Sequence, residues 1–294
     1  MTLSEIPDGV IHTGGGRFRR QDGFILFVVD RLMASVDFHN LYKYILVSLT
    51  EVSLTPTGLA SVRHVTQDLG QTLMLDSGVY GFVNDYIRKH DTDEPFGEVR
   101  KKSPSTFADF EALVRKYVQF VQYFENDLWG YVEIDIGSPA EKTATRKLLE
   151  GYGLKPIPVY HPAVDDYDYF DYLAERYDRV CCGNMGQASE PIRMRILATL
   201  YERARKYPYL WVHVLGTRNH HWFNAYPLQS ADATSWLEGL RFGQITHYVD
   251  GYPMGALSEE YTYRQTEQYA KARHLAAYTV AMDVRVRRDR NEIY

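Results

Sequence analysis

The sequence is poor in cysteine, and its only two cysteines are neighbours, Cys181 and Cys182, in a chain of 294 residues. Two adjacent thiols exclude a disulfide framework and a multi-cysteine zinc site, and they fit a reducing compartment. We therefore interpret both as buried residues of a strand.

Apolar runs of membrane-spanning length are also missing. None approaches the roughly 20 residues that a helix needs to cross a bilayer. The segment from Met1 to Val10 carries acids and a proline where a signal peptide would carry an apolar core. We expect a soluble, cytoplasmic protein with no membrane partner.

A basic excess is absent as well. Lysine and arginine number 33 against 38 aspartates and glutamates, so the formal net charge is -5. This balance does not by itself indicate a nucleic-acid binder, although an acidic total can contain a local basic patch. With 45% hydrophobic residues, the chain can bury a sizeable core, and we expect one large α/β domain.

Short apolar runs that are typical of buried strands alternate with segments of helical periodicity. The predicted strands are 44–49, 72–75, 131–134, 156–160, 179–182, 210–215, 228–231 and 244–249. The clearest helices are predicted from Phe107 to Phe124, at 139–150 behind a first-turn proline, and from Pro191 onward. Eight strands alternating with helices is the count of a (β/α)8 TIM barrel, which is the predicted fold.

The barrel is expected to occupy residues 44–257 as a single domain. Residues 1–43 are expected to form an irregular arm and a plug, with a strand at 24–29 that joins or plugs the sheet. A C-terminal helix is predicted within 258–294, packed on the barrel, with Ser258 as its N-cap.

Three carboxylates follow three different predicted strands: Asp76, Asp135 and Asp232. A single aspartate in this place is often only the cap of the next helix. The carboxyl ends of barrel strands are nevertheless where the chemistry of this fold is found. Desolvated carboxylates that lie close together have different pKa values, so one can stay ionised as a nucleophile while another moves a proton.

Several segments around these acids resemble the tRNA-guanine transglycosylases. Leu-Asp-Ser-Gly-Val-Tyr at 75–80 is similar to that family's Asp-Ser-Gly-Gly-Tyr/Phe motif, and the block from Gly216-Thr217 to Asp232 is similar to its Gly-Thr loop and nucleophilic aspartate. Further segments resemble the short, phage-associated relatives of this family, some of which exchange guanine in DNA for a 7-deazaguanine. They read Tyr-Val-Glu-Ile-Asp, Pro-Ile-Pro-Val-Tyr-His, Cys-Gly-Asn-Met-Gly and Ser-Ala-Asp-Ala-Thr-Ser-Trp, and the match spans roughly residues 44 to 250 in order.

The resemblance implies a reaction and two catalytic residues. Asp232 would attack the anomeric carbon of a guanosine or deoxyguanosine, expel guanine and form a covalent glycosyl-aspartate. Asp76 would take a proton from the incoming base, for example 7-cyano-7-deazaguanine. Two displacements retain the configuration at this carbon, as in retaining glycosidases.

The resemblance also implies how the base is bound. Asp135 would accept the amino and ring N–H groups of guanine, a pairing that rejects adenine. Tyr80 would stack on one face of the base and His213 would lie near the other, although His213 can equally be a core residue. The remaining substrate-binding residues that it implies are Ser77, Gly78, His161, Gly183, Asn184 and Gly216, with the amides of the Gly183-Asn184 turn meeting the base carbonyl.

Two features depart from the tRNA enzymes, a missing cysteine motif and the short length of the chain. Their Cys-X-Cys-X-X-Cys motif after the nucleophile is missing, so no zinc-binding subdomain, metal or cofactor is expected. Because the zinc subdomain helps those enzymes to hold RNA, DNA becomes the more favoured substrate and tRNA the alternative. A homodimer is left open, since the tRNA enzymes form one, and a phage origin would place the protein in the host cytoplasm.

A base inside a duplex must be unstacked before its anomeric carbon can be reached, unless the strand is already single. Aromatic and basic side chains can stack on and hold such a strand, and the basic cluster at 100–102 is the best phosphate-binding candidate in the first half of the chain. The candidates are Tyr80, Trp222, Trp236, Arg100, Lys101, Lys102, Arg218 and Arg241.

Two other functional classes compete with this interpretation. Several histidines accompany Asp232 and are typical of a metal-dependent TIM-barrel hydrolase, but the early His-X-His of that class is missing. The third class is a barrel that only binds a nucleobase or nucleic acid, which the intact Asp76 and Asp232 disfavour. The histidines in question are His161, His213, His220, His221 and His247.

Overall fold

The computed structural model describes most of the chain between Val10 and Asp283. The described residues are 10–13, 17–20, 25–29, 42–183, 185, 189–207, 210–217, 220–226, 228–234, 244–249, 252–258 and 273–283. Within these ranges, no helix has the length and apolar character that a membrane crossing requires.

Eight strands form one sheet, in the order β6-β5-β4-β3-β10-β9-β8-β7. The strands are β3 (Ile25–Val29), β4 (Tyr44–Ser48), β5 (Thr72–Asp76), β6 (Leu128–Tyr131), β7 (Val159–Tyr160), β8 (Arg179–Cys182), β9 (Trp211–Val214) and β10 (Ser230–Ala233). Each strand neighbours the next in sequence except β6 and β7, which stand at the two ends of this order and whose flanking residues Val132 and Ile157 form a parallel bridge. The last strand, β10, pairs in parallel with the first, β3. This is the strand order of a (β/α)8 barrel, so the predicted fold is confirmed.

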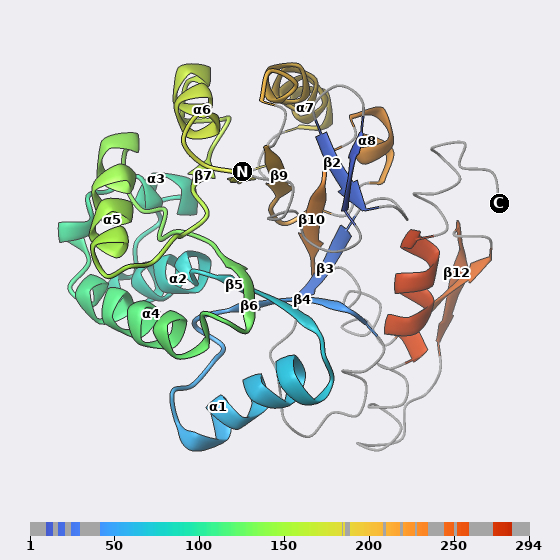
Figure 1. The fold of residues 1–294 in the computed structure, drawn as a ribbon, viewed down its shortest axis with the longest axis horizontal. Coiled ribbons are helices and arrows are strands. Elements are labelled where there is room, and N and C mark those ends of the chain that lie inside the picture. The colour runs from blue at the N-terminus through green and yellow to red at the C-terminus, as the bar shows by residue number, and fades with distance from the viewer. Residues whose placement is uncertain are drawn as a thin grey trace. The chain divides into compact units, whose positions relative to one another are not determined.

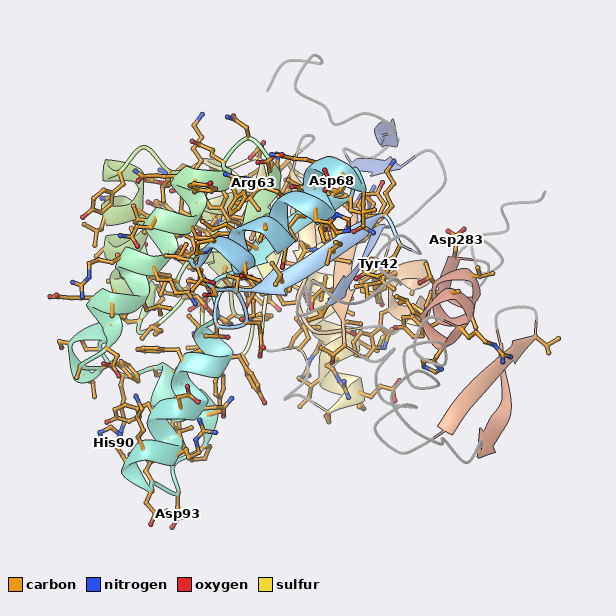
Figure 2. The ribbon with its side chains drawn as sticks, turned by 90° about the horizontal axis from the view of Figure 1, so that it is seen from below. Tyr42, Arg63, Asp68, His90, Asp93 and Asp283 are labelled. Carbon is orange, nitrogen blue, oxygen red and sulfur yellow. The ribbon has the colours of Figure 1, made fainter. Side chains whose placement is uncertain are left out.

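The helices between these strands have the expected positions. They are α1 (Pro56–Arg63), α2 (Val79–His90), α3 (Phe96–Arg100), α4 (Phe110–Phe124), α5 (Pro139–Gly151), α6 (Tyr167–Ala174), α7 (Glu190–Ala204) and α8 (His220–Ala225). A π-helical turn at His64–Asp68 continues α1, and Figure 2 shows Arg63 and Asp68 along this continuous helical segment. Residues 273–283 are also helical.

The barrel begins one strand earlier than the sequence analysis predicts. The segment expected to join or plug the sheet joins it as β3, the first strand. In contrast, β11 (Gln244–Val249), expected to be the last barrel strand, pairs antiparallel with β12 (Tyr252–Ser258) in a separate sheet. Ser258 therefore ends a strand and does not cap a helix. Part of the arm, expected to be irregular, is an antiparallel pair, β1 (Val10–Thr13) with β2 (Arg17–Arg20).

Contacts divide the chain into two compact units, each of which is described by itself. The first consists of Met1–Val29, Ser35–Tyr44 and Tyr160–Tyr294, and the second of Asp30–Ala34 and Ile45–Val159. The second unit contains β5 and β6, which pair in parallel, with α2 to α5 gathered beside them (Figure 1).

Local sequence explains the helices of the second unit. In α4, apolar residues recur every three or four positions and are buried along one face, as the sequence predicts: Leu113, Val114, Tyr117, Val118, Val121 and Phe124. In α5, Ser138 and Glu141 form a reciprocal capping box ahead of the first-turn Pro139, which satisfies backbone N–H groups that a helix start leaves open.

The first unit is built on β3, β10, β9 and β8, which pair in parallel in this order; Figure 1 labels the first three. Alternate residues of β8, β9 and β10 contribute to an apolar cluster with helices α6, α7 and α8. Cys182 belongs to this cluster, and both cysteines are buried strand residues as expected. The side chains between these residues point to the opposite face of the same strands, away from the apolar cluster.

Candidate active site

The Asp232 cluster is a group of polar side chains on two neighbouring strands: Trp211 and His213 on β9, and Ser230 and Asp232 on β10. Successive side chains of a strand point to opposite faces, so two residues that are two positions apart point the same way. The residues between them pack into the apolar cluster beneath the helices. The register aligns Ser230 with His213 and brings the two polar pairs into contact.

Asp232 is held through one of its two carboxylate oxygens. Its side chain is only 9% exposed. Oδ1 accepts a hydrogen bond from the Gly216 backbone N–H at 3.0 Å and lies 3.2 Å from Nε2 of His213. Oδ2 accepts no hydrogen bond from any residue that the structure describes. The carboxylate is thus held through Oδ1, whereas Oδ2 has no hydrogen-bond donor among the described residues.

His213 is buried and uses both ring nitrogens inside the protein. Its Nδ1 lies 2.8 Å from Oγ of Ser230, which in turn accepts the indole N–H of Trp211 at 2.7 Å. Phe27 of β3 packs edge-to-face against the imidazole, with 5.5 Å between the ring centroids. The sequence analysis did not include Ser230 or Trp211 in the site, although their spacing of two from Asp232 and His213 was the available signal.

The turns after β7, β8 and β9 contain the other candidates of this unit. Gly216 has φ +67°, a conformation that favours glycine, and this turn directs its N–H to Asp232. His161 is buried, with its backbone N–H bonded to Oδ2 of Asp165 at 2.8 Å. The Gly183 N–H donates to the Tyr160 carbonyl at 2.9 Å, so this amide is already engaged and does not await a base carbonyl. Asn184 lies outside the described residues.

In the second unit, Asp76 is the last residue of β5 and stabilises the turn that follows. Its Oδ2 accepts the Gly78 N–H at 3.0 Å, and its carbonyl accepts the Leu49 N–H at 2.9 Å. Gly78 has φ +80°, and a Cβ there would lie 2.9 Å from Cγ2 of Thr50. The turn therefore requires glycine for both conformation and space, while Ser77 is buried within it.

Asp135 follows β6 and is paired with a buried arginine. Nη1 of Arg100 donates to the Asp135 carbonyl at 2.9 Å and lies 3.8 Å from its Oδ2. The carbonyl of Arg100 accepts the Gly137 N–H at 2.8 Å, which ties α3 to the same loop. The expectation that Arg100 contacts phosphate is therefore wrong, because α3 turns this side chain inward to hold Asp135.

The two lysines that follow Arg100 also have partners. Lys101 pairs with Glu98 and Lys102 with Glu94, each at 2.7 Å. Their charge is therefore partly neutralised within the same loop, which weakens the interpretation of this segment as a phosphate contact.

Glu133, two positions before Asp135, forms a fully buried ion pair. Its Oε2 accepts from Nη1 of Arg146 at 2.7 Å and its Oε1 accepts the Val159 N–H at 2.7 Å. Burial raises the pKa of Glu133 from its usual range to about 7, and the Arg146 guanidinium opposes this shift. The pair links the segment after β6 to α5 and β7, so we interpret it as a stabilising contact and not as part of the active site.

Of the aromatic candidates for stacking, Tyr80 alone among the described side chains is open to solvent. It is 70% exposed and packs against Phe96, with 5.1 Å between the ring centroids. Trp222 is buried, and the Arg193 guanidinium lies 4.9 Å from its ring centroid, which contradicts a role in stacking on a strand. Trp236 and two of the basic candidates, Arg218 and Arg241, lie outside the described residues.

A metal centre finds no support among the described side chains. They contain no group of three or more histidine, cysteine, aspartate or glutamate residues that could hold a metal ion. The side chains of His220, His221 and His247 lie outside the described part of the chain.

Sequence comparison assigns the chain to no known family. No protein family matches the sequence, and no curated protein matches it. Among solved structures, it is similar to a protein of Aquifex aeolicus VF5, with a TM-score of 0.49 and 9% identity over 88% of this chain and 93% of that one. A tryptophan synthase from M. tuberculosis has a TM-score of 0.47 and 12% identity, over 90% of this chain and 94% of that one. The tryptophan synthase alpha chain of Legionella pneumophila subsp. pneumophila has a TM-score of 0.46 and 11% identity, over 89% and 92%. Likenesses of this strength carry no information about function.

Proposed function

We propose that the protein is a base-exchange transglycosylase, a pentosyltransferase that replaces guanine in a polynucleotide with a 7-deazaguanine such as 7-cyano-7-deazaguanine. The observation that carries this proposal is the Asp232 carboxylate, which is anchored through Oδ1 and presents Oδ2. A carboxylate that attacks carbon needs one oxygen whose lone pair is not engaged by a donor. The Gly216 N–H and Nε2 of His213, which both contact Oδ1, hold the carboxylate in this orientation.

The second unit supplies residues that suit the rest of the reaction. Asp76 ends a strand in a turn built around Gly78, and Tyr80 is an exposed ring close behind it in sequence. An exposed aromatic ring suits stacking on a nucleobase. Asp135, held by Arg100, suits the recognition of paired N–H donors on a guanine edge.

The proposed exchange balances its bonds and protons. Oδ2 of Asp232 forms a bond to C1′ as the bond from C1′ to N9 of guanine breaks, and the electron pair of that bond goes to guanine. Asp76, as the acid, gives guanine its proton. The resulting Asp76 carboxylate then takes the N9 proton of the incoming 7-deazaguanine, whose nitrogen attacks C1′ and releases Asp232.

The polymer is proposed to be DNA, with tRNA as the alternative. The exchange itself does not distinguish them, because the attacked carbon lies next to the 2′ position in both. The preference for DNA comes from the missing cysteine motif. A strand with its target base unstacked is the form in which C1′ becomes accessible.

The test is incorporation of radiolabelled guanine into acid-insoluble polymer, with duplex DNA, single-stranded DNA and bulk tRNA offered separately. Label in DNA alone is the expected result, and label in tRNA alone would move the protein to the alternative. The same reactions, chased with 7-cyano-7-deazaguanine, should release the label.

The matched control is Asp232→Asn, which keeps the shape of the side chain but removes the nucleophilic charge. It should abolish both incorporation and the covalent protein–polymer adduct seen on a denaturing gel. Asp76→Asn should also abolish exchange but should leave some adduct, because its task is proton transfer. Full exchange in Asp232→Asn would refute the proposed function.

A further inference from the structure

We infer that His213 is a positioning residue, which orients the Asp232 carboxylate so that Oδ1 is held and Oδ2 faces the anomeric carbon. This inference rests on the proposed function and deepens it. The implied alternative role, a contact with the base, fits the structure less well, because His213 is buried and both of its ring nitrogens have partners.

The hydrogen bonds around His213 determine its tautomer. An ionised Asp232 carboxylate can only accept, so Nε2 must carry a proton to bond Oδ1. In the neutral imidazole, Nδ1 is then an acceptor and must receive the hydroxyl proton of Ser230.

Trp211 makes this arrangement directional. Its indole N–H can only donate, and it occupies a lone pair of the Ser230 oxygen at 2.7 Å. The hydroxyl proton of Ser230 is thus left for Nδ1 of His213. A chain of donors runs from Trp211 through Ser230 and His213 to Asp232, and each member fixes the polarity of the next.

Two other interpretations of the same residues are disfavoured by burial and by the direction of the contacts. A serine nucleophile is excluded because Ser230 is fully buried and accepts from Trp211, so its oxygen faces no substrate. A purely structural histidine would need no contact with the carboxylate that presents a free oxygen. His213 makes that contact, and the Gly216 N–H makes a second one on the same oxygen.

The orientation has a measurable kinetic consequence. A hydrogen bond to a charged group contributes enough that its loss lowers a rate roughly 10- to 100-fold. Because His213 contacts Asp232 and not the base, its removal should lower kcat, while KM for the base should stay within about threefold of the wild-type value. A residue that stacks on the base would raise KM.

The experiment combines a spectroscopic and a kinetic measurement on the full chain. Long-range ¹H–¹⁵N spectra of ¹⁵N-histidine-labelled protein report the tautomer of His213, whose signals are identified by their loss in His213→Leu. Exchange of labelled guanine is then compared for wild type, His213→Leu and His213→Gln. The glutamine amide can donate to Oδ1 and its carbonyl can accept from Ser230, so it is the conservative rescue variant. Circular dichroism confirms that each variant is folded.

The expected result is a proton on Nε2 of His213, a kcat that falls in His213→Leu, and recovery to within about tenfold of wild type in His213→Gln. Protonation at Nδ1 alone, an unchanged kcat in His213→Leu, or an equal loss in both variants would overturn the inference. If the wild type exchanges no base in any polymer, the proposed function fails, while the tautomer still decides whether His213 donates to Asp232.

Discussion

The buried pair of Glu133 and Arg146 allows a quantitative test of how the second unit is held together. Both side chains are 1% exposed, and their closest atoms are 2.7 Å apart. Removing one partner of such a pair leaves a buried charge without compensation, which costs about 3–5 kcal/mol. We therefore expect Arg146→Met to lower the free energy of unfolding by that amount at neutral pH.

The double variant should lose less than Arg146→Met alone. In Glu133→Gln/Arg146→Met, the glutamine carbonyl can still accept the Val159 N–H that Oε1 of Glu133 accepts at 2.7 Å. No charge remains buried at the pair, and the principal loss is one amide NH₂ without a partner, which costs about 1–3 kcal/mol. The two substitutions should therefore be strongly non-additive.

The measurement is urea unfolding of wild type, both single variants and the double variant. An exposed pair on α4 provides the control, since Arg115 and Glu111 lie 3.4 Å apart with side chains 66% and 88% exposed. Glu111→Gln should change stability by less than about 0.5 kcal/mol. A loss below about 1 kcal/mol in Arg146→Met, or a double variant that loses as much as Arg146→Met, would refute the reasoning.

Three shorter predictions follow from the same structure. Because burial raises the pKa of Glu133 from 4.5 to about 7, its contribution to stability is full below about pH 4.5 and is lost as pH rises through 7. In urea unfolding, the free energy of unfolding of wild type relative to that of Glu133→Gln should therefore fall by about 3 kcal/mol between about pH 4 and pH 8. A rise in this difference with pH would contradict the assignment. Gly78→Ala should cost about 2 kcal/mol or more through strain and a close contact, whereas Gly70→Ala, at φ +62° with no atom within 4 Å, should cost only about 1. Cys181 and Cys182 are buried, and burial raises the pKa of the Cys182 thiol, so neither should react with a disulfide reagent until the protein unfolds; rapid labelling of the native protein would show that this strand is open.

Elements with a complete local signal could be predicted from the sequence. The strand Arg179–Cys182 has the predicted bounds, and α4 has both its predicted bounds and its buried face. Pro139 opens α5 as expected, because a first-turn proline costs no hydrogen bond. In these cases the period of apolar residues and the residues at the ends agree.

The closure of the barrel could not be predicted in this way. Ile25–Val29 and Gln244–Val249 are both short and apolar, and composition does not show which of them pairs with β10. That pairing joins segments about 200 positions apart in sequence, and it depends on packing that no local pattern describes. Ser258 was misjudged for the same reason, since a good N-cap residue also fits the end of a strand.

The candidate site shows the same limit. Asp76 and Asp232 could be located because each stands at the end of an apolar run. The bond between His213 and Asp232 could not, because it depends on the register that aligns Ser230 with His213. Arg100 was misassigned because a basic cluster in a polar segment is usually solvated, and only the fold of α3 shows that this member is buried.

The donor chain that ends at Asp232 also restricts how this protein can diverge. If Ser230 became alanine by itself, Nδ1 of His213 and the indole N–H of Trp211 would both lose their partner in the interior. Each is a penalty that selection would act against. We therefore expect positions 211, 213 and 230 to covary among natural homologues, with intermediates depleted, while Asp232 stays constant wherever the activity is retained.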